Sequence, residues 1–198
     1  MKMRVLDISE NNGLVDFEPI AKTYYGVILR LGYGNRHLDE QFLYNYRMAK
    51  EAGLKIGIYY YSYALDRDMA TNEGQFTVEI LKEYGIEPSD LSLGVWFDME
   101  DADDYKARNG MPSNEEITAM CSNYIVELNK AGYWCGIYAS LDWLENVIYT
   151  DQLADYVYYW VAQWDDDLDW DKNVFLWQYT ATEYFEGKYF DCSFLMKR

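Results

Sequence analysis

The chain is poor in the residues that build metal sites and cross-links. Its 198 residues include one histidine, His37, three cysteines and three prolines. A single histidine excludes a multi-histidine metal centre and makes any Ser-His-Asp or Cys-His arrangement depend on that one residue. Because His37 lies in the turn-like stretch 34–37 (GNRH), we expect it at the surface. Hydrolytic chemistry in this chain therefore has to rely on carboxylates.

The three cysteines, Cys121, Cys135 and Cys192, form no CxxC pair. Their number is odd, so at least one is unpaired within the chain. Buried free thiols are the simplest interpretation.

Basic residues are also scarce, with 17 Lys and Arg against 34 Asp and Glu, a formal net charge of −17. A chain this acidic repels phosphate backbones and anionic lipids, so we expect neither nucleic acid nor a membrane as a partner. The N-terminus enters a predicted strand directly, without an apolar segment of the kind that directs export or spans a membrane. No stretch rich in Pro, Gly or Ser marks a linker, and we expect a single domain over residues 1–198.

Hydrophobic and aromatic residues are abundant. Half of the chain is hydrophobic and 18% is aromatic, including 21 tyrosines and 7 tryptophans. Such a chain can bury a substantial core. Aromatic rings with polar tips also suit a groove that stacks on sugar rings, although core packing explains most of them.

Eight segments rich in β-branched and aromatic residues predict strands. They cover residues 4–9, 26–31, 55–63, 93–99, 133–139, 157–164, 173–179 and 189–195. Helical spacing of apolar residues predicts helices over 39–52, 69–84 and 113–131, with shorter ones at 16–22 and 141–147. Gly53 is placed to end the first of these, and Ser113 with Glu116 forms a capping-box pattern at the start of the third.

This alternation predicts an α/β fold with a parallel sheet and helices outside it. Eight strands favour a closed, TIM-like barrel. The last three strands are joined by segments too short for crossover helices, so the expected architecture is irregular, (β/α)5(β)3, with about five main helices.

Segment 94–101 (GVWFDMED) begins with the apolar residues of a predicted buried strand and ends with acidic residues. Residues two apart in a strand share a face, so Asp98 and Glu100 should point the same way with Cα atoms roughly 6–7 Å apart. At the C-terminal rim of a barrel, two crowded carboxylates repel each other, and one keeps its proton to higher pH. That one can serve as a general acid, as cleavage of a glycosidic bond requires.

Taken alone, this Asp-x-Glu is better explained as a solvated strand end leading into an acidic loop. Asp7, at the end of the first strand, and Asp191, in the eighth, change that balance. The first and eighth strands are neighbours in a closed barrel, so four acids converge on one rim.

The order of these motifs resembles glycoside hydrolase family 25, the Chalaropsis-type lysozymes of bacteria and phages. The matching segments are 6–9 (LDIS) with 12–13 (NG), 27–30 (VILR) with 32–34 (GYG), 39–54, 57–62 (GIYYYS), 97–100 (FDME), 160–162 (WVA), 177–179 (WQY) and 189–191 (YFD). Each motif is weak alone, but their order and spacing over nearly the whole chain are specific. One departure is Ser193, where the closing motif often has Asn after Asp-x.

The resemblance implies an eight-stranded barrel with five main helices and N-acetylmuramidase activity on peptidoglycan. We expect no cofactor or metal, because the chain has one histidine and no Cys/His ligand spacing. The resemblance makes Glu100 the general acid and gives Asp98 the task of steadying the substrate's acetamido group or the developing positive charge. Asp7 and Asp191 would shape and charge the site. Arg30, Tyr61, Tyr138 and Gln178 are candidates for the sugar groove, with a structural role as the alternative for each.

Other interpretations stay open at this point. A chitinase-like barrel also ends its fourth strand in Asp-x-Glu, but it normally carries further Asp residues upstream, where this chain has Ser92, Gly94 and Trp96. A sugar-binding barrel without activity would not need both Asp98 and Glu100. A magnesium-dependent phosphotransferase would need a phosphate-binding loop that the sequence lacks.

The expected partner is bacterial peptidoglycan, and the expected state a monomer. Lacking a visible leader, the protein is expected to reach the wall either as a phage product released at lysis or by export without one.

Overall fold

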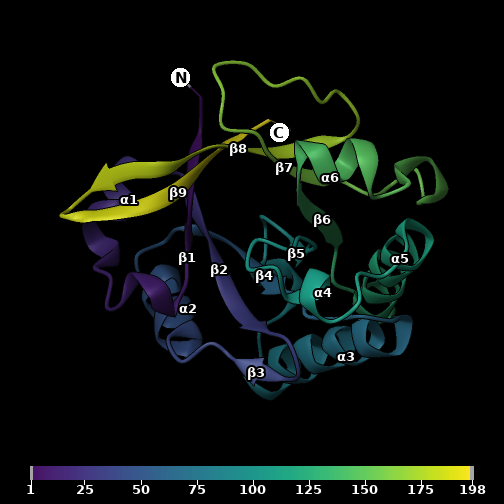
Figure 1. The fold of residues 1–198 in the computed structure, drawn as a ribbon. Coiled ribbons are helices and arrows are strands. Elements are labelled where there is room, and N and C mark those ends of the chain that lie inside the picture. The colour runs from purple at the N-terminus through teal and green to yellow at the C-terminus, as the bar shows by residue number, and fades with distance from the viewer. Residues whose placement is uncertain (1, 197–198) are drawn as a thin grey trace.

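The computed structural model describes residues 2–196 and contains a closed barrel with helices on its outside (Figure 1). Neighbouring strands pair in the order β1-β9-β8-β7-β6-β5-β4-β2, and β2 pairs with β1 to close the ring. The barrel strands are β1 (Arg4–Ile8), β2 (Gly26–Tyr33), β4 (Lys55–Tyr61), β5 (Val95–Asp98), β6 (Cys135–Ser140), β7 (Tyr159–Ala162), β8 (Val174–Phe185) and β9 (Lys188–Leu195). The predicted TIM-like barrel of eight strands is confirmed.

Parallel pairing holds around the ring except at β9, which runs antiparallel to both β8 and β1. The chain turns directly from β8 into β9, so no crossover helix is needed there. This gives the predicted irregularity at the C-terminal end of the fold.

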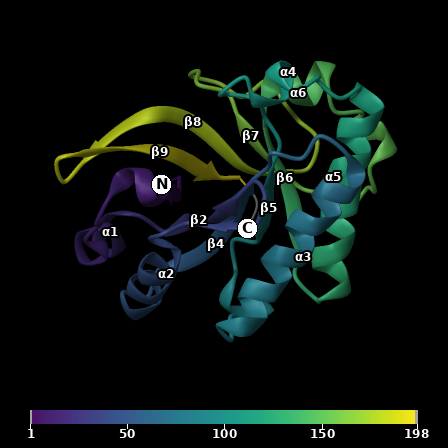
Figure 2. The ribbon, with the colours of Figure 1, turned by 60° about the horizontal axis from the view of Figure 1, so that its bottom comes forward.

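The five predicted helices are present, and a sixth helix of four residues, α4, follows β5. Their bounds are α1 (Phe17–Thr23), α2 (Phe42–Glu51), α3 (Arg67–Glu83), α4 (Tyr105–Arg108), α5 (Asn114–Lys130) and α6 (Leu141–Asn146). Helices α3 and α5 lie side by side against the barrel (Figure 2). Within residues 2–196, no helix combines the length and apolar character needed to cross a membrane.

Local signals at two helix ends behave largely as expected. Gly53 follows α2 with φ +76°, a conformation that costs glycine little. The Ser113 side chain accepts from the Glu116 backbone N–H at the start of α5. The reciprocal half of the capping box is absent, because the Glu116 carboxylate binds Arg67 of α3 instead.

Two hydrophobic cores hold the fold together. The larger lies between the barrel wall and the helices and includes Phe17, Phe42, Leu81 and Tyr124. The smaller fills the barrel interior with Val5, Ile28, Leu93, Trp96, Tyr138, Trp160 and Leu176. Because the interior is packed with large side chains, any site on the barrel must lie at its ends.

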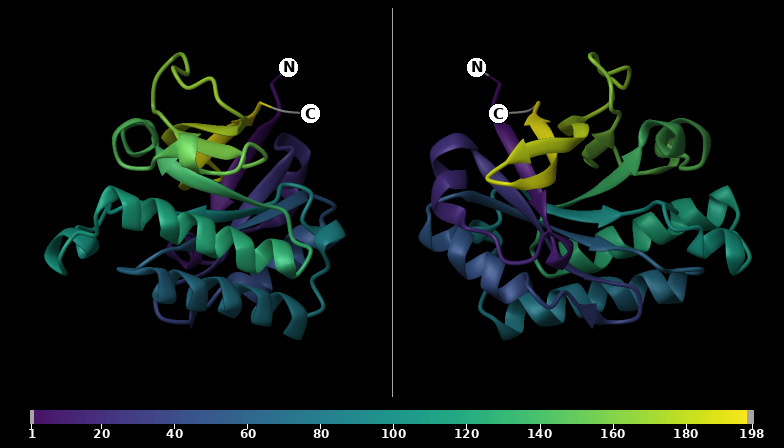
Figure 3. Two further views of the ribbon diagram at one scale, coloured as in Figure 1. Left: turned by 90° about the vertical axis from the view of Figure 1, so that its right-hand side faces the viewer. Right: turned by 60° about the vertical axis from the view of Figure 1, so that its left-hand side comes forward.

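The β8–β9 hairpin is the main element that the sequence pattern underestimates. The predicted strand ended at residue 179, but β8 continues to Phe185 and pairs with β9 beyond the barrel rim, alongside α1 (Figure 3). Residues 180–184 (TATEY) are partly buried or exposed and include no aliphatic residue larger than alanine, so they carry little of the apolar signal that marks a strand. The two-residue strand β3 (His37–Leu38) and the 3-10 helices Glu10–Asn12, Pro88–Asp90 and Thr150–Gln152 were not predicted either.

Candidate active site

A cavity of about 190 Å³ opens at the C-terminal ends of the parallel strands. It is lined by Asp7, Asn11, Arg30, Tyr59, Tyr61, Asp98, Glu100, Tyr138, Trp160, Gln178 and Asp191. All eight side chains singled out from the sequence are therefore in one place, although they come from segments up to 184 residues apart in the chain. The closed barrel explains this, because each strand delivers its last inward side chain to the same rim.

Asp98 is the last residue of β5 and is almost fully buried. Its backbone carbonyl accepts from Ser62 N–H at the end of β4, and the next residue, Met99, donates to the Tyr138 carbonyl. One carboxyl oxygen, Oδ1, is buried and has no hydrogen-bond partner in the protein. A buried acceptor without a donor is costly, and it is a place where a bound N–H group would be stabilised.

Glu100 lies two residues beyond Asp98, past the end of the strand, and faces the same cavity. Burial raises the pKa of Glu100 to about 7, against the influence of Lys106 and with help from Asp191, Asp103 and Asp101. Burial raises the pKa of Asp98 well above its usual value, and repulsion from Glu100 adds to the effect. Glu100 is thus protonated over a useful fraction of neutral pH, as a general acid needs to be.

Asp7 and Asp191 face each other directly across the β1–β9 pair, and their carboxyl groups share a hydrogen bond. Burial raises the pKa of Asp7 well above its usual value, with repulsion from Asp191 as the next cause. Burial also raises the pKa of Asp191. The pair therefore favours a shared proton over two full charges.

Gln178 links this pair to the far wall of the cavity. Its Nε2 donates to Asp7 Oδ2 at 3.1 Å, while its Oε1 accepts from Tyr138 Oη and Trp164 Nε1, each at 3.1 Å. Tyr138 and Gln178 are both buried. Their hydrogen bonds hold the floor of the cavity in one arrangement, which is as much a structural role as a binding one.

Arg30 and Tyr61 stand where the cavity continues into a wider groove of about 340 Å³. That groove is also lined by Glu10, Asn11, Tyr33, Tyr63 and Asp103. The Arg30 guanidinium donates to Asp39 at 2.8 Å and to Glu10 at 2.9 Å and lies over the Tyr33 ring. Tyr63 donates to Asp103 at 2.6 Å. A groove with tyrosine faces and fixed polar groups can hold a chain of sugar rings.

Sequence reasoning missed several residues of the site. Asn11 sits in the 3-10 turn after β1, where only a short polar loop was visible in the sequence. Tyr59 and Trp160 belong to strands that were predicted, but strand alternation alone does not separate a cavity wall from a packed core. Trp164, with 65% of its surface exposed, reaches the site only through its hydrogen bond to Gln178.

The cysteines, His37 and Ser193 were also considered from the sequence, and none of them lines the catalytic cavity. Cys121, Cys135 and Cys192 are free and buried, as predicted. His37 is exposed and stacks near Tyr33, outside the residues that line the catalytic cavity. Ser193 is buried and accepts from Trp160 Nε1 at 2.9 Å, so this departure from the usual motif anchors the cavity wall.

Comparison with known proteins identifies the family. A family model described as glycosyl hydrolases family 25 matches residues 6–188. The chain belongs to this family. No curated protein sequence matches this chain significantly. Family 25 membership makes the protein a glycoside hydrolase by family and favours the lysozyme interpretation over the chitinase-like one.

Solved structures agree with this assignment of the family 25 chain. The modular autolysin LytC from Streptococcus pneumoniae, in complex with a synthetic peptidoglycan ligand, matches with a TM-score of 0.84 and 25% identity over 97% of this chain. The match spans 46% of LytC, so this chain corresponds to about half the length of that relative.

Two further solved structures share the fold. A family 25 glycosyl hydrolase from Bacillus anthracis matches with a TM-score of 0.79 and 17% identity, covering 100% of this chain and 90% of that one. The catalytic domain of endolysin ply40 from bacteriophage P40 of Listeria monocytogenes matches with a TM-score of 0.77 and 20% identity, covering 98% and 93%.

Proposed function

We propose that this family 25 protein is an N-acetylmuramidase that hydrolyses the β-1,4 bond between N-acetylmuramic acid and N-acetylglucosamine in bacterial peptidoglycan, and that residues 1–198 act as one catalytic domain. The observation that carries the proposal is the pairing of two unlike acids in one cavity. Glu100 has a pKa of about 7, while Asp98 presents a buried oxygen without a donor. The peptidoglycan ligand bound by LytC supports the choice of substrate.

In the proposed first step, Glu100 gives its proton to the glycosidic oxygen as the bond to the sugar's anomeric carbon breaks. The carbonyl oxygen of the substrate's own acetamido group attacks that carbon, which yields a cyclic oxazolinium ion. Repulsion favours one proton shared by the two carboxyl groups, and in this step Glu100 carries it. Ionised Asp98 then accepts the acetamido N–H through its unpartnered oxygen and stabilises the positive charge. A water molecule then attacks the anomeric carbon and opens the ring, and the Glu100 carboxylate takes a proton from that water.

Asp7 and Asp191 take a supporting role in this scheme. Their shared proton leaves them with less than two charges, so they contribute polarity and shape beside the reacting carbon. Arg30, Tyr61, Tyr138 and Gln178 line the path of the sugar chain. No step calls for a metal or cofactor.

The groove can extend past the rim along the β8–β9 hairpin. Ser193 and Asp191 of β9 face the barrel interior, so Tyr189, two residues further, continues the same face. Its ring lies 5.1 Å from that of Tyr184, and both rings are more than 60% exposed. The hairpin is tied to the loop that carries Asn11, because Lys188 Nζ donates to the Asn12 carbonyl at 2.6 Å. We therefore include the two tyrosines in the proposed glycan path.

The bacterial cell wall is the proposed place of action. The acidic surface speaks against nucleic-acid or anionic membrane partners, and a monomer is proposed.

Mass analysis of the products from purified peptidoglycan tests the proposed bond. A muramidase leaves N-acetylmuramic acid at the new reducing end, whereas cleavage on the other side leaves N-acetylglucosamine there. NMR of the first-formed product should show retained configuration. An inverted anomer would contradict acetamido participation, and binding without any cleavage would favour the inactive sugar-binding barrel.

A further inference from the structure

Lys106, in the short helix α4, is a fully buried lysine that the catalytic scheme above leaves without a task. Its Nζ donates to the backbone carbonyls of Ser62 at 2.5 Å and Glu100 at 2.7 Å. Its own backbone N–H donates to Asp101 Oδ1 at 2.6 Å. A buried lysine is rare unless it is paired, so these contacts need an explanation.

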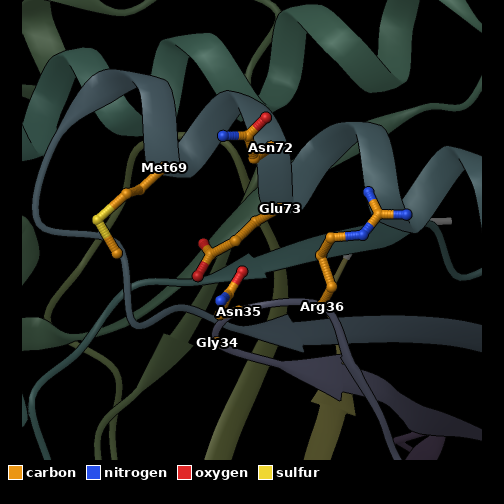
Figure 4. Close-up of a pocket in the computed structure, with 6 residues that line it drawn as sticks. All are labelled: Gly34, Asn35, Arg36, Met69, Asn72 and Glu73. Atoms are coloured by element: carbon orange, nitrogen blue, oxygen red, sulfur yellow. The ribbon is translucent and has the colours of Figure 1, made fainter.

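The buried carboxyl group beside it is Glu73 of α3, 3% exposed. Glu73 Oε2 accepts from Ser62 Oγ at 2.7 Å, and Oε1 accepts from Tyr63 N–H at 2.9 Å. Figure 4 shows the Glu73 side chain leaving its helix toward the loop that carries Gly34 and Asn35. Ser62 thus lies between the two buried groups, with its carbonyl on Lys106 and its hydroxyl on Glu73.

Lys106 faces charged groups from several elements. Glu73 approaches from α3, and Asp98, Glu100 and Asp101 approach from β5 and the loop after it. On the side of α5 it faces the uncharged thiol of Cys121. Glu100 in turn faces Asp191 of β9 and Asp103 and Asp101 of its own loop.

We propose that Lys106 is a positioning residue for the catalytic pair, which fixes the backbone of Glu100 against the end of β4 and places a buried positive charge behind Asp98 and Glu100. The inference rests on the proposed function, because it assigns Lys106 to that same site.

The position of Glu100 explains why such a contact is needed. The β-ladder between β5 and its neighbours ends with Asp98, and Met99 N–H makes the last backbone bond to β6. Glu100 is therefore no longer held by the sheet. The Lys106 ammonium joins the Glu100 carbonyl to Ser62, and Asp101 accepts from the backbone N–H groups of Lys106 and Ala107. These bonds close the loop into a compact turn with the general acid at its base.

The charge acts on the same two carboxyl groups. Lys106 lowers the pKa of Glu100 and of Asp98 against the larger effect of burial. Removing the charge should raise both pKa values. The acid limb of the pH–rate profile reports loss of the first proton from the Asp98–Glu100 pair, and the alkaline limb reports loss of the second. Both limbs should therefore move to higher pH.

The test is the pH profile of kcat/KM on solubilised peptidoglycan for Lys106→Met, Lys106→Gln and Lys106→Arg, with folding checked by circular dichroism. The two neutral variants are expected to move both limbs upward by about one pH unit, the size of a nearby-charge effect. Lys106→Gln can still donate to one carbonyl, so it should keep a higher kcat than Lys106→Met. Lys106→Arg keeps the charge and should keep the wild-type limb positions.

Lys50→Met is the matched control, since Lys50 is a surface lysine paired with Asp90 far from the cavity, and its profile should not move. Limbs that stay within about 0.2 pH unit in folded, neutral Lys106 variants would overturn the proposal. Failure of both neutral variants to fold would also overturn it, because the lysine would then serve the fold alone. A wild-type protein that cuts nothing would instead refute the proposed function.

Discussion

Asp98 and Glu100 are separated by one residue yet occupy different environments. Asp98 ends a strand and is held by backbone bonds on both sides, whereas Glu100 lies on a turn closed by Lys106. Burial raises the pKa of both carboxyl groups, that of Glu100 to about 7, and Asp98 is raised further by repulsion from Glu100. Environment, and not residue type, thus divides the roles of the two carboxyl groups.

Glu100→Gln should lower kcat on peptidoglycan by about 10²–10⁴, the usual contribution of a general acid, with the fold intact. Asp104→Asn is a matched control, because Asp104 is an exposed acid of the same loop in a left-handed conformation that Asn also tolerates. Turbidity loss of killed cells and product mass analysis measure the effect. Activity of Glu100→Gln within a few-fold of wild type would remove Glu100 from the mechanism.

Asp98→Asn should be nearly as damaging, with a loss of about 10² or more in kcat, because a neutral amide cannot stabilise an oxazolinium charge. The same substitution should change KM little, since hydrogen bonding to the acetamido group is partly kept. Steady-state kinetics on a defined muropeptide chain separates kcat from KM. A variant that loses only a few-fold in kcat would argue against acetamido participation.

At the scale of single elements, the β8–β9 hairpin determines which side chains lie beside the proposed glycan path. The β8–β9 hairpin is held on its outer face by Tyr24, which packs edge-on against Phe185 and donates to Glu183 at 2.7 Å. Its other face carries Tyr184 and Tyr189 into solvent. An element fixed on one face and aromatic on the other is suited to contact a long substrate.

The double variant Tyr184→Ala/Tyr189→Ala should raise KM for long glycan chains several-fold and leave kinetics on a disaccharide-length substrate unchanged. The reason is that stacking surface is lost only beyond the rim. Tyr156→Ala, which removes an equally exposed tyrosine elsewhere, is the control. Equal effects on short and long substrates would exclude the hairpin from the glycan path.

At the scale of the whole molecule, the buried acids affect stability. The pKa of each of Asp7, Asp98, Glu100, Asp191 and Glu73 is raised in the folded state, mainly by burial. A group with a raised folded pKa stabilises the fold below its unfolded pKa, and that contribution is lost as pH rises through the folded pKa. The free energy of unfolding should therefore fall between about pH 4.5 and pH 8.

Glu100→Gln provides the test of this linkage, because it removes one of these ionisations. With a folded pKa of about 7 for Glu100, the variant should be more stable than wild type at pH 8 by about 2 kcal/mol after allowance for partial solvent exposure. At pH 4.5 the difference should nearly vanish. Urea unfolding at the two pH values measures it, and an advantage independent of pH would contradict the assigned pKa.

The sequence by itself determined the barrel and much of the site. Strand and helix periodicity reflects burial that any compact fold must satisfy. All eight barrel strands, apart from the outer half of β8, and the five main helices could therefore be predicted from residue type and apolar spacing. Asp98 and Glu100 could be predicted as site residues because they follow a buried strand and because Asp7 and Asp191 fall on strands that meet at the same rim.

Only the tertiary structure decided what surrounds those acids. The hydrogen bond from Gln178 to Asp7 joins residues 171 positions apart, and no local pattern encodes it. Lys106 looks in the sequence like an ordinary charge of an acidic loop, and its burial beside Glu73 follows from how α4 folds back onto the barrel end. The outer half of β8 could not be predicted for the same reason, because it is a strand through its pairing with β9 and not through apolar spacing of its own.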